Sequence, residues 1–222
     1  MKKLALISTV CLAFVCTSCL NIVEEIFLKK DGSGSYSISV DMNEMMNMMQ
    51  GLMTQEQMDE NDMFGQMDST IQETLAQLRS VDGLSNVSHK SEGYKFTISY
   101  DFTSVAVLND ATKNGNVTPG MDFNSGTTDN FTWSKGTFER ANPPLGDLME
   151  DEEFASNFEM AKMFMTGASY KTIYHMPGKV SKMENDQARL SGDKKTVTLD
   201  VQLVDVLEGK SLLGNKVKFK GK

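Results

Sequence analysis

The 222-residue chain has only three cysteines, four prolines, two histidines and one tryptophan. So few cysteines and prolines exclude a disulfide-stapled miniprotein and a proline-rich linker. Basic residues are in the minority as well, because 22 lysines and arginines face 30 acidic residues, for a formal net charge of −8. Nucleic-acid binding needs lysine and arginine to displace counterions from phosphates, so we expect no nucleic-acid partner. Hydrophobic residues make up 40% of the chain, which predicts a folded globular protein.

Residues 1–18 have the pattern of a secretory signal peptide. Lys2 and Lys3 precede an apolar run, residues 4–15, which is shorter than the roughly 20 residues of a transmembrane helix. The sequence Cys16-Thr17-Ser18-Cys19 that follows resembles the lipobox of bacterial lipoproteins, although leucine is usual where Cys16 stands. The resemblance implies that Cys19 carries a diacylglyceryl group (palmitate-type acyl chains) and becomes the first residue of the mature chain. The alternatives are an ordinary cleaved signal and an uncleaved anchor.

The positions of the cysteines favour the lipoprotein interpretation. All three lie within the first 19 residues, so the mature chain would keep Cys19 alone and could form no internal disulfide. A lone thiol is a liability in an oxidising compartment, and lipidation removes it. Removing residues 1–18 takes away two lysines and no acid, which makes the net charge −10. Anionic headgroups repel such a chain, so we expect acyl chains to hold it to a bacterial envelope membrane, on the periplasmic or surface face.

Alternating and helical patterns predict the secondary structure. Residues 22–42 alternate between apolar and polar on both sides of the turn at residues 31–34, which predicts a β-hairpin, and a second outgoing strand follows at residues 94–102. Between the two hairpins the apolar residues recur at helical spacing. They are Met42, Met46, Met49 and Met53, followed by Phe64, Met67, Ile71, Leu75 and Leu78.

The second half of the chain is predicted to contain one helix and several strands. Residues 109–130 are rich in Asn, Gly, Thr and Asp, which predicts a long polar loop or an insertion. A helix is expected over residues 147–165, and further strands near residues 131–133, 170–174, 197–203 and 217–219. Alternating lysines after residue 215 favour a solvated edge strand, with a phosphate or lipopolysaccharide contact as the alternative. Residues 19–222 are therefore predicted to form a single α+β domain, a mostly antiparallel sheet with two or three helices packed on one face.

Three segments carry a resemblance to a known family. They are residues 30–36, just after the predicted lipidation site, residues 176–180 (Met-Pro-Gly-Lys-Val) and residues 190–197 (Leu-Ser-Gly-Asp-Lys-Lys-Thr-Val). Together they resemble the LppM-like lipoproteins of bacterial envelopes, and the methionine-rich helix resembles Bacteroidetes-type members. The resemblance implies a small, membrane-anchored α+β domain. Its motifs are turn sequences, so it implies no catalytic residues.

The methionines are the most unusual feature, since the chain contains 17 of them. Met45, Met46, Met48 and Met49 would place several thioethers on adjacent helical turns. The four-three-four spacing that starts at Met42 is typical of core packing. Two alternatives remain: a plastic apolar surface for a protein or lipid partner, and a Cu(I) site, which soft thioether ligands select.

No catalytic or metal-binding constellation is found in the sequence. The chain has no GxSxG, HExxH or CxxC motif, and His89 and His175 both fall in strand-like segments. We therefore expect no cofactor and a lipid-anchored, non-enzymatic envelope protein that binds a protein or lipid partner through its sheet or its methionine-rich helix. The alternative is a soft-metal binder. A cleft holding either histidine beside a carboxylate would favour an enzyme.

Overall fold

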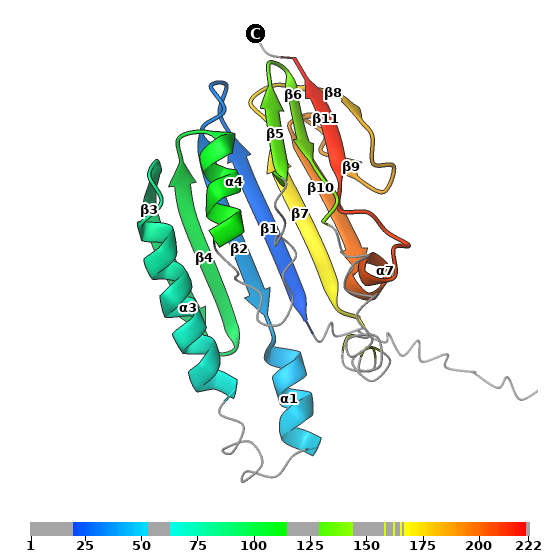
Figure 1. The fold of residues 1–222 in the computed structure, drawn as a ribbon. Coiled ribbons are helices and arrows are strands. Elements are labelled where there is room, and N and C mark those ends of the chain that lie inside the picture. The colour runs from blue at the N-terminus through cyan, green and yellow to red at the C-terminus, as the bar shows by residue number, and fades with distance from the viewer. Residues whose placement is uncertain are drawn as a thin grey trace, which may run out of the picture.

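The structure is a computed structural model that describes residues 20–52, 63–114, 129–143 and 167–220, together with Phe158, Lys162 and Met165. Two sheets and a group of helices form an α+β fold, as predicted (Figure 1). The larger sheet has the strand order β3-β4-β2-β1-β7-β10-β9, and the smaller one has the order β5-β6-β11-β8.

The first predicted hairpin is confirmed as β1 (Asn21–Leu28) and β2 (Gly34–Asp41). Ile22, Glu24, Ile26 and Leu28 of β1 face the core, while the alternate side chains lie on the open face of the sheet. Gly34 has a steric role, because a Cβ atom there would lie 2.0 Å from the carbonyl oxygen of Phe27. Such an approach allows only glycine.

The rest of the larger sheet extends from both sides of this hairpin. The second predicted hairpin consists of β3 (Leu84–Glu92) and β4 (Lys95–Phe102), and β4 pairs with β2. On the other side, β7 (Ser169–His175) runs parallel to β1, followed by β10 (Thr196–Gln202) and β9 (Arg189–Leu190). The remaining pairs are antiparallel, which confirms the mostly antiparallel sheet.

The smaller sheet was not separated from the larger one by sequence reasoning. It contains β5 (Phe131–Ser134), β6 (Thr137–Arg140), β8 (Val180–Met183) and β11 (Asn215–Phe219). The predicted edge strand near the C-terminus is wrong, because β11 lies between β6 and β8. The alternating lysines mark the solvent face of a central strand, where Lys216 pairs with Glu139 at 2.6 Å, while Val217 and Phe219 are buried.

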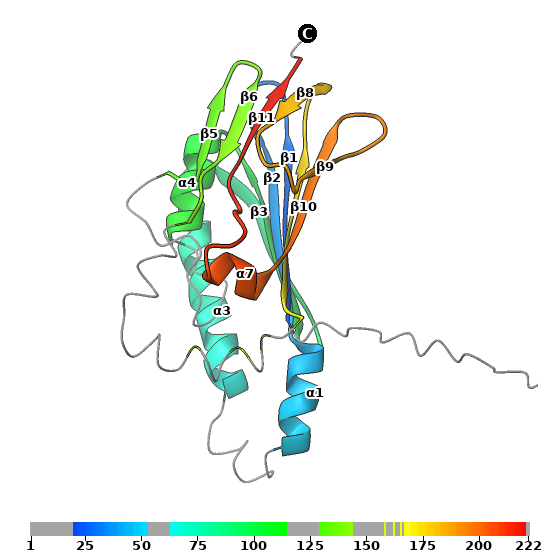
Figure 2. The same ribbon diagram turned by 90° about the vertical axis from the view of Figure 1, so that its right-hand side faces the viewer.

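The helices are α1 (Asn43–Leu52), α3 (Met63–Arg79), α4 (Val105–Asn114) and the short α7 (Leu203–Leu207). Helices α3 and α4 lie on the same side of the larger sheet as the smaller sheet, so one face is covered, as predicted (Figure 2). Ile71, Leu75 and Leu78 of α3 are buried, as the helical spacing predicts. None of the helices in the described ranges is long and apolar enough to cross a membrane.

The prediction of a loop over residues 109–130 is wrong for residues 109–114, which belong to α4. The Ser104 hydroxyl accepts the backbone N–H of Val107 at 3.3 Å, which caps the helix, and Leu108 and Ala111 are buried. Asn109 is buried too, because its side chain donates to the carbonyl of Phe131 at 2.8 Å and accepts the Phe131 N–H at 2.9 Å. Residues 115–128 lie outside the described ranges.

Other predictions also fall partly outside the described residues. This applies to residues 1–18, to Cys19, and to the segment after α1 that includes Met53. Of the helix predicted over residues 147–165, Phe158, Lys162 and Met165 are described, and all three are helical. The single domain spanning 19–222 stays a prediction.

Candidate functional site

The proposed lipidation site is joined directly to the folded domain. Cys19 is linked by one peptide bond to Leu20, which is 4% exposed and accepts the backbone N–H of Ser169 at 2.9 Å. The next residue, Asn21, pairs with Asp41 of β2 on one side and with Ser169 of β7 on the other. The ordered sheet therefore starts within two residues of Cys19, without a linker.

The antiparallel register places the methionine-rich helix at the same end of the domain. Asn21, the first residue of β1, pairs with Asp41 of β2, and α1 starts two residues after Asp41. Met46 is 2% exposed and belongs to the core, as its spacing from Met42 predicts. Met45 and Met48 are partly exposed, and Met45 packs against the core. Met49 lies in the helix, but its side chain is outside the described part of the chain.

Polar contacts fix the start of α1. Asp41 Oδ1 accepts both the backbone N–H of Asn43, at 3.2 Å, and its side-chain amide, at 2.8 Å. Asn43 Oδ1 in turn accepts the backbone N–H of Tyr94, in the turn of the second hairpin, at 3.1 Å. About two turns further along the helix, the Gln50 amide donates to the Tyr94 hydroxyl at 2.9 Å. These contacts hold the direction in which α1 leaves the sheet.

A buried ionic network between the two sheets was missed in the sequence. Glu24 of β1 and Arg140 of β6 are both almost fully buried, with Arg140 Nε 3.2 Å from Glu24 Oε1 and Arg140 Nη2 3.3 Å from Glu24 Oε2. Tyr170 and Tyr174 of β7 donate their hydroxyls to the same carboxylate, at 3.1 and 3.0 Å. Glu24 shares its parity in β1 with Ile22 and Ile26, which was the available signal.

Burial and the neighbouring charges shift the pKa of Arg140 and of the two tyrosines in this network. Burial, and then the negative charge of Glu24, raise the pKa of Tyr170 and Tyr174 well above the usual value of 10. Burial by itself lowers the pKa of Arg140, but Glu24 and the two tyrosines together raise it well above its usual value. The network joins β1 and β7 of the larger sheet to β6 of the smaller one, and Arg140 also lines the second cavity described below.

The histidines were the candidates for a catalytic base. His175 Nε2 lies 2.7 Å from Glu25 Oε1, and its Nδ1 lies 3.3 Å from the Thr196 hydroxyl. Phe27, which is 47% exposed, stacks on the imidazole with ring centroids 3.8 Å apart. A histidine beside a carboxylate is therefore present, but it lies on the open face of the sheet and lines none of the cavities given below. His89 lies in β3, and its Nε2 is buried without a hydrogen-bond partner in the described part of the structure.

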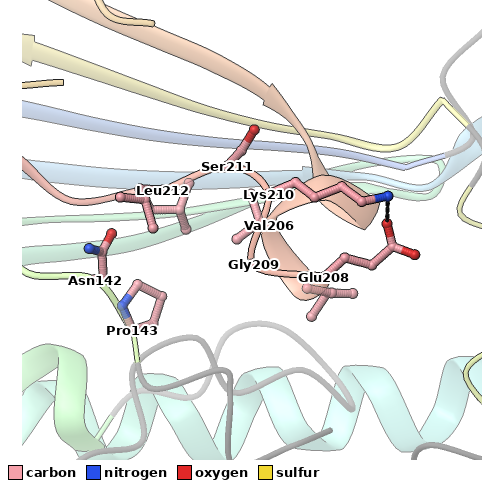
Figure 3. Close-up of a pocket in the computed structure, with 10 residues that line it drawn as sticks. Asn142, Pro143, Val206, Glu208, Gly209, Lys210, Ser211 and Leu212 are labelled. Carbon is pink, nitrogen blue, oxygen red and sulfur yellow. Dashed lines mark ion pairs between the residues drawn. The ribbon is translucent and has the colours of Figure 1, made fainter. Parts of the chain in front are cut away.

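Two neighbouring cavities lie beside α7 and the loop after it. The first has a volume of about 650 Å³, and Figure 3 shows Asn142 and Pro143 across it from this loop. Glu208 pairs with Lys210 and, at 2.7 Å, with Lys162, while Leu212 is 54% exposed. The second cavity, of about 720 Å³, is more polar and shares Asn142, Lys210 and Leu212 with the first. Of the residues singled out in the sequence, Lys216 lines the second cavity, whereas His89 and His175 line neither.

The described residues hold no group of three or more His, Cys, Asp or Glu side chains placed as metal ligands. This observation does not concern the methionines of α1, whose thioethers would be the ligands of a Cu(I) site. Of the four candidate methionines, Met46 is enclosed in the core. The copper hypothesis therefore depends on Met45, Met48 and Met49.

No protein-family model matches the chain, and no curated protein matches it in sequence. Among solved structures, the chain is similar to the folded domain of the LppM protein of Mycobacterium tuberculosis, determined by NMR. The match covers 91% of this chain and 90% of that one, with 8% sequence identity and a TM-score of 0.42. It agrees with the LppM-like resemblance carried by the three turn segments, and the likeness concerns the fold alone.

Proposed function

We propose that the chain is a lipid-anchored, non-enzymatic protein of a bacterial cell envelope that binds a protein or lipid partner. The observation that carries the proposal is the direct junction between Cys19 and the buried Leu20. Cleavage in front of Cys19 would remove the whole signal and leave every described residue of the domain in place. The acyl chains would then hold an acidic domain that has little electrostatic attraction for anionic lipid.

The non-enzymatic part of the proposal is supported by the two ionic clusters of the domain. In the Glu24–Arg140 network, both carboxylate oxygens of Glu24 accept hydrogen bonds from Arg140 and from the two tyrosines. The His175–Glu25 pair is open to solvent, both its ring nitrogens have partners, and Phe27 covers one face of the imidazole. General-base catalysis needs a base directed at a bound substrate. Glu24, Glu25 and His175 are not among the residues that line the two cavities, and Arg140, which lines the second cavity, is paired with Glu24.

The anchor is tested by intact mass of the protein extracted from membranes, for the wild type and for Cys19→Ser. The proposal predicts loss of residues 1–18 together with a mass gain from acyl chains, both abolished in Cys19→Ser. Cys11→Ser is the matched control, since it changes a cysteine of the removed segment and should leave the mature mass unchanged. An unacylated chain in the wild type would contradict the proposal.

A further inference from the structure

The end of the domain that carries the anchor also carries α1. In a trans chain, consecutive Cα atoms are 3.8 Å apart, so an acylated Cys19 is held within one residue of the first strand. Asn21, the first residue of β1, faces Asp41 across the hairpin, and α1 starts at Asn43. Cys19 and Asn43 each lie two residues from this pair, so their Cα atoms are at most about 20 Å apart.

Helix α1 projects away from the sheet at this end, in line with β2 (Figures 1 and 2). Its first turn is the packed part, where Met42 and Met46 are buried. At 100° per residue, Met48 lies about 160° around the helix from Met46. Met48 is thus an apolar residue on the side of the helix away from the core, and it is partly exposed.

The charge of the helix fits a lipid surface. Glu44 is the one charged residue of the α1 sequence, in a chain that would carry −10 after removal of residues 1–18. Helix α3, on the covered side of the sheet, carries the exposed charges Asp68, Glu73 and Arg79. A methionine-rich helix whose single charge lies in its first turn costs little to desolvate beyond that turn, and the unbranched thioether side chain adapts to an irregular apolar surface.

We propose that α1 lies in the interface of the membrane that holds the anchor, with Met45 and Met48 against lipid. This inference rests on the proposed function, because the acyl chains on Cys19 bring the helix to the bilayer. A short helix with one apolar side binds membranes weakly by itself, but tethering turns its insertion into an intramolecular step. The contacts of Asp41, Asn43 and Tyr94 fix the angle at which it enters. The domain then has one orientation on the membrane.

The test uses the acylated protein in phosphatidylcholine vesicles, with a fluorophore on a single introduced thiol. The mature chain offers no other free thiol, since its one cysteine is the lipidated Cys19. Met48→Cys reports on α1. Lys30→Cys is the control, since it lies just beyond the end of β1 opposite the anchor, and the eight residues of β1 span about 27 Å. Spin-labelled lipid should quench the label at position 48 at least about threefold more strongly than the label at position 30, since interfacial helices insert about 5–10 Å.

A second pair of variants avoids any disturbance of the helix by the label itself. With the label on Asn47→Cys, an exposed position, adding Met48→Glu should abolish most of the quenching, whereas Met48→Leu should retain it. Equal, weak quenching at positions 30 and 48 in a protein whose mass shows acylation would overturn the orientation and leave the anchor intact. Shielding of position 48 from lipid, with crosslinking to an envelope protein, would also overturn it. Absence of acyl mass would instead refute the anchor itself.

Discussion

Removing the charge of Glu24 is the perturbation whose effect on stability follows most directly from the structure. Glu24→Gln keeps the shape of the side chain but leaves the Arg140 guanidinium buried without its carboxylate. Breaking a buried pair from one side costs about 3–5 kcal/mol. At about 2–4 °C per kcal/mol for a domain of this size, Tm should fall by about 6–20 °C.

The assay is urea unfolding of the Cys19→Ser chain without residues 1–18, with tyrosine and tryptophan fluorescence as the readout. Arg140→Met should destabilise the chain by a comparable amount, because Glu24 then becomes the unpaired charge. The double variant Glu24→Leu with Arg140→Met should be more stable than either single variant, since two apolar side chains need no compensation. Single variants within about 1 kcal/mol of the parent, or additive losses in the double variant, would refute a buried, mutually dependent pair.

Three further predictions concern pH, backbone space and metal. Unfolding the chain exposes tyrosines whose pKa is raised in the fold. The free energy of unfolding should therefore be constant below pH 10 and should fall as pH rises above it, by up to about 5 kcal/mol per pH unit. A flat profile between pH 9 and about 11 in urea titrations would contradict the burial of these tyrosines. Gly34→Ala should lower the urea midpoint, whereas Gly51→Ala, with open space around its added Cβ in α1, should leave it unchanged or raise it. The mature protein should not compete with a Cu(I) chelator, and Cu(I) retention lost on replacing Met45 and Met48 by leucine would instead establish the metal site.

The regular parts of the fold could be predicted because their patterns are local. Alternation in β1, β2 and β4 follows from one buried and one open face, and the Ile71, Leu75 and Leu78 stripe follows from a helix with one packed side. The core position of Met46 was predicted in the same way, from its spacing to Met42. Each of these depends on periodicity within a single element.

The features that sequence reasoning missed depend on contacts between distant elements. Glu24 interrupts the run of apolar residues on the buried face of β1, and its burial is explained by Arg140, 116 positions away, together with Tyr170 and Tyr174. Asn109 is typical of a loop in sequence, and its burial is explained by the two hydrogen bonds between its amide and Phe131 of β5. Likewise, the lysines of β11 reveal a solvent face, but whether a strand is central or at an edge depends on its neighbours β6 and β8.

The junction between anchor and domain is tested most directly by the mass of the N-terminal tryptic peptide from membrane-extracted protein. The account predicts that this peptide begins at Cys19, ends at Lys29 and carries acyl chains on its first residue. Such a peptide would place the lipid one residue from the buried Leu20 and at the end of the sheet from which α1 projects. An unmodified peptide, or one that begins at any other residue, would contradict the account.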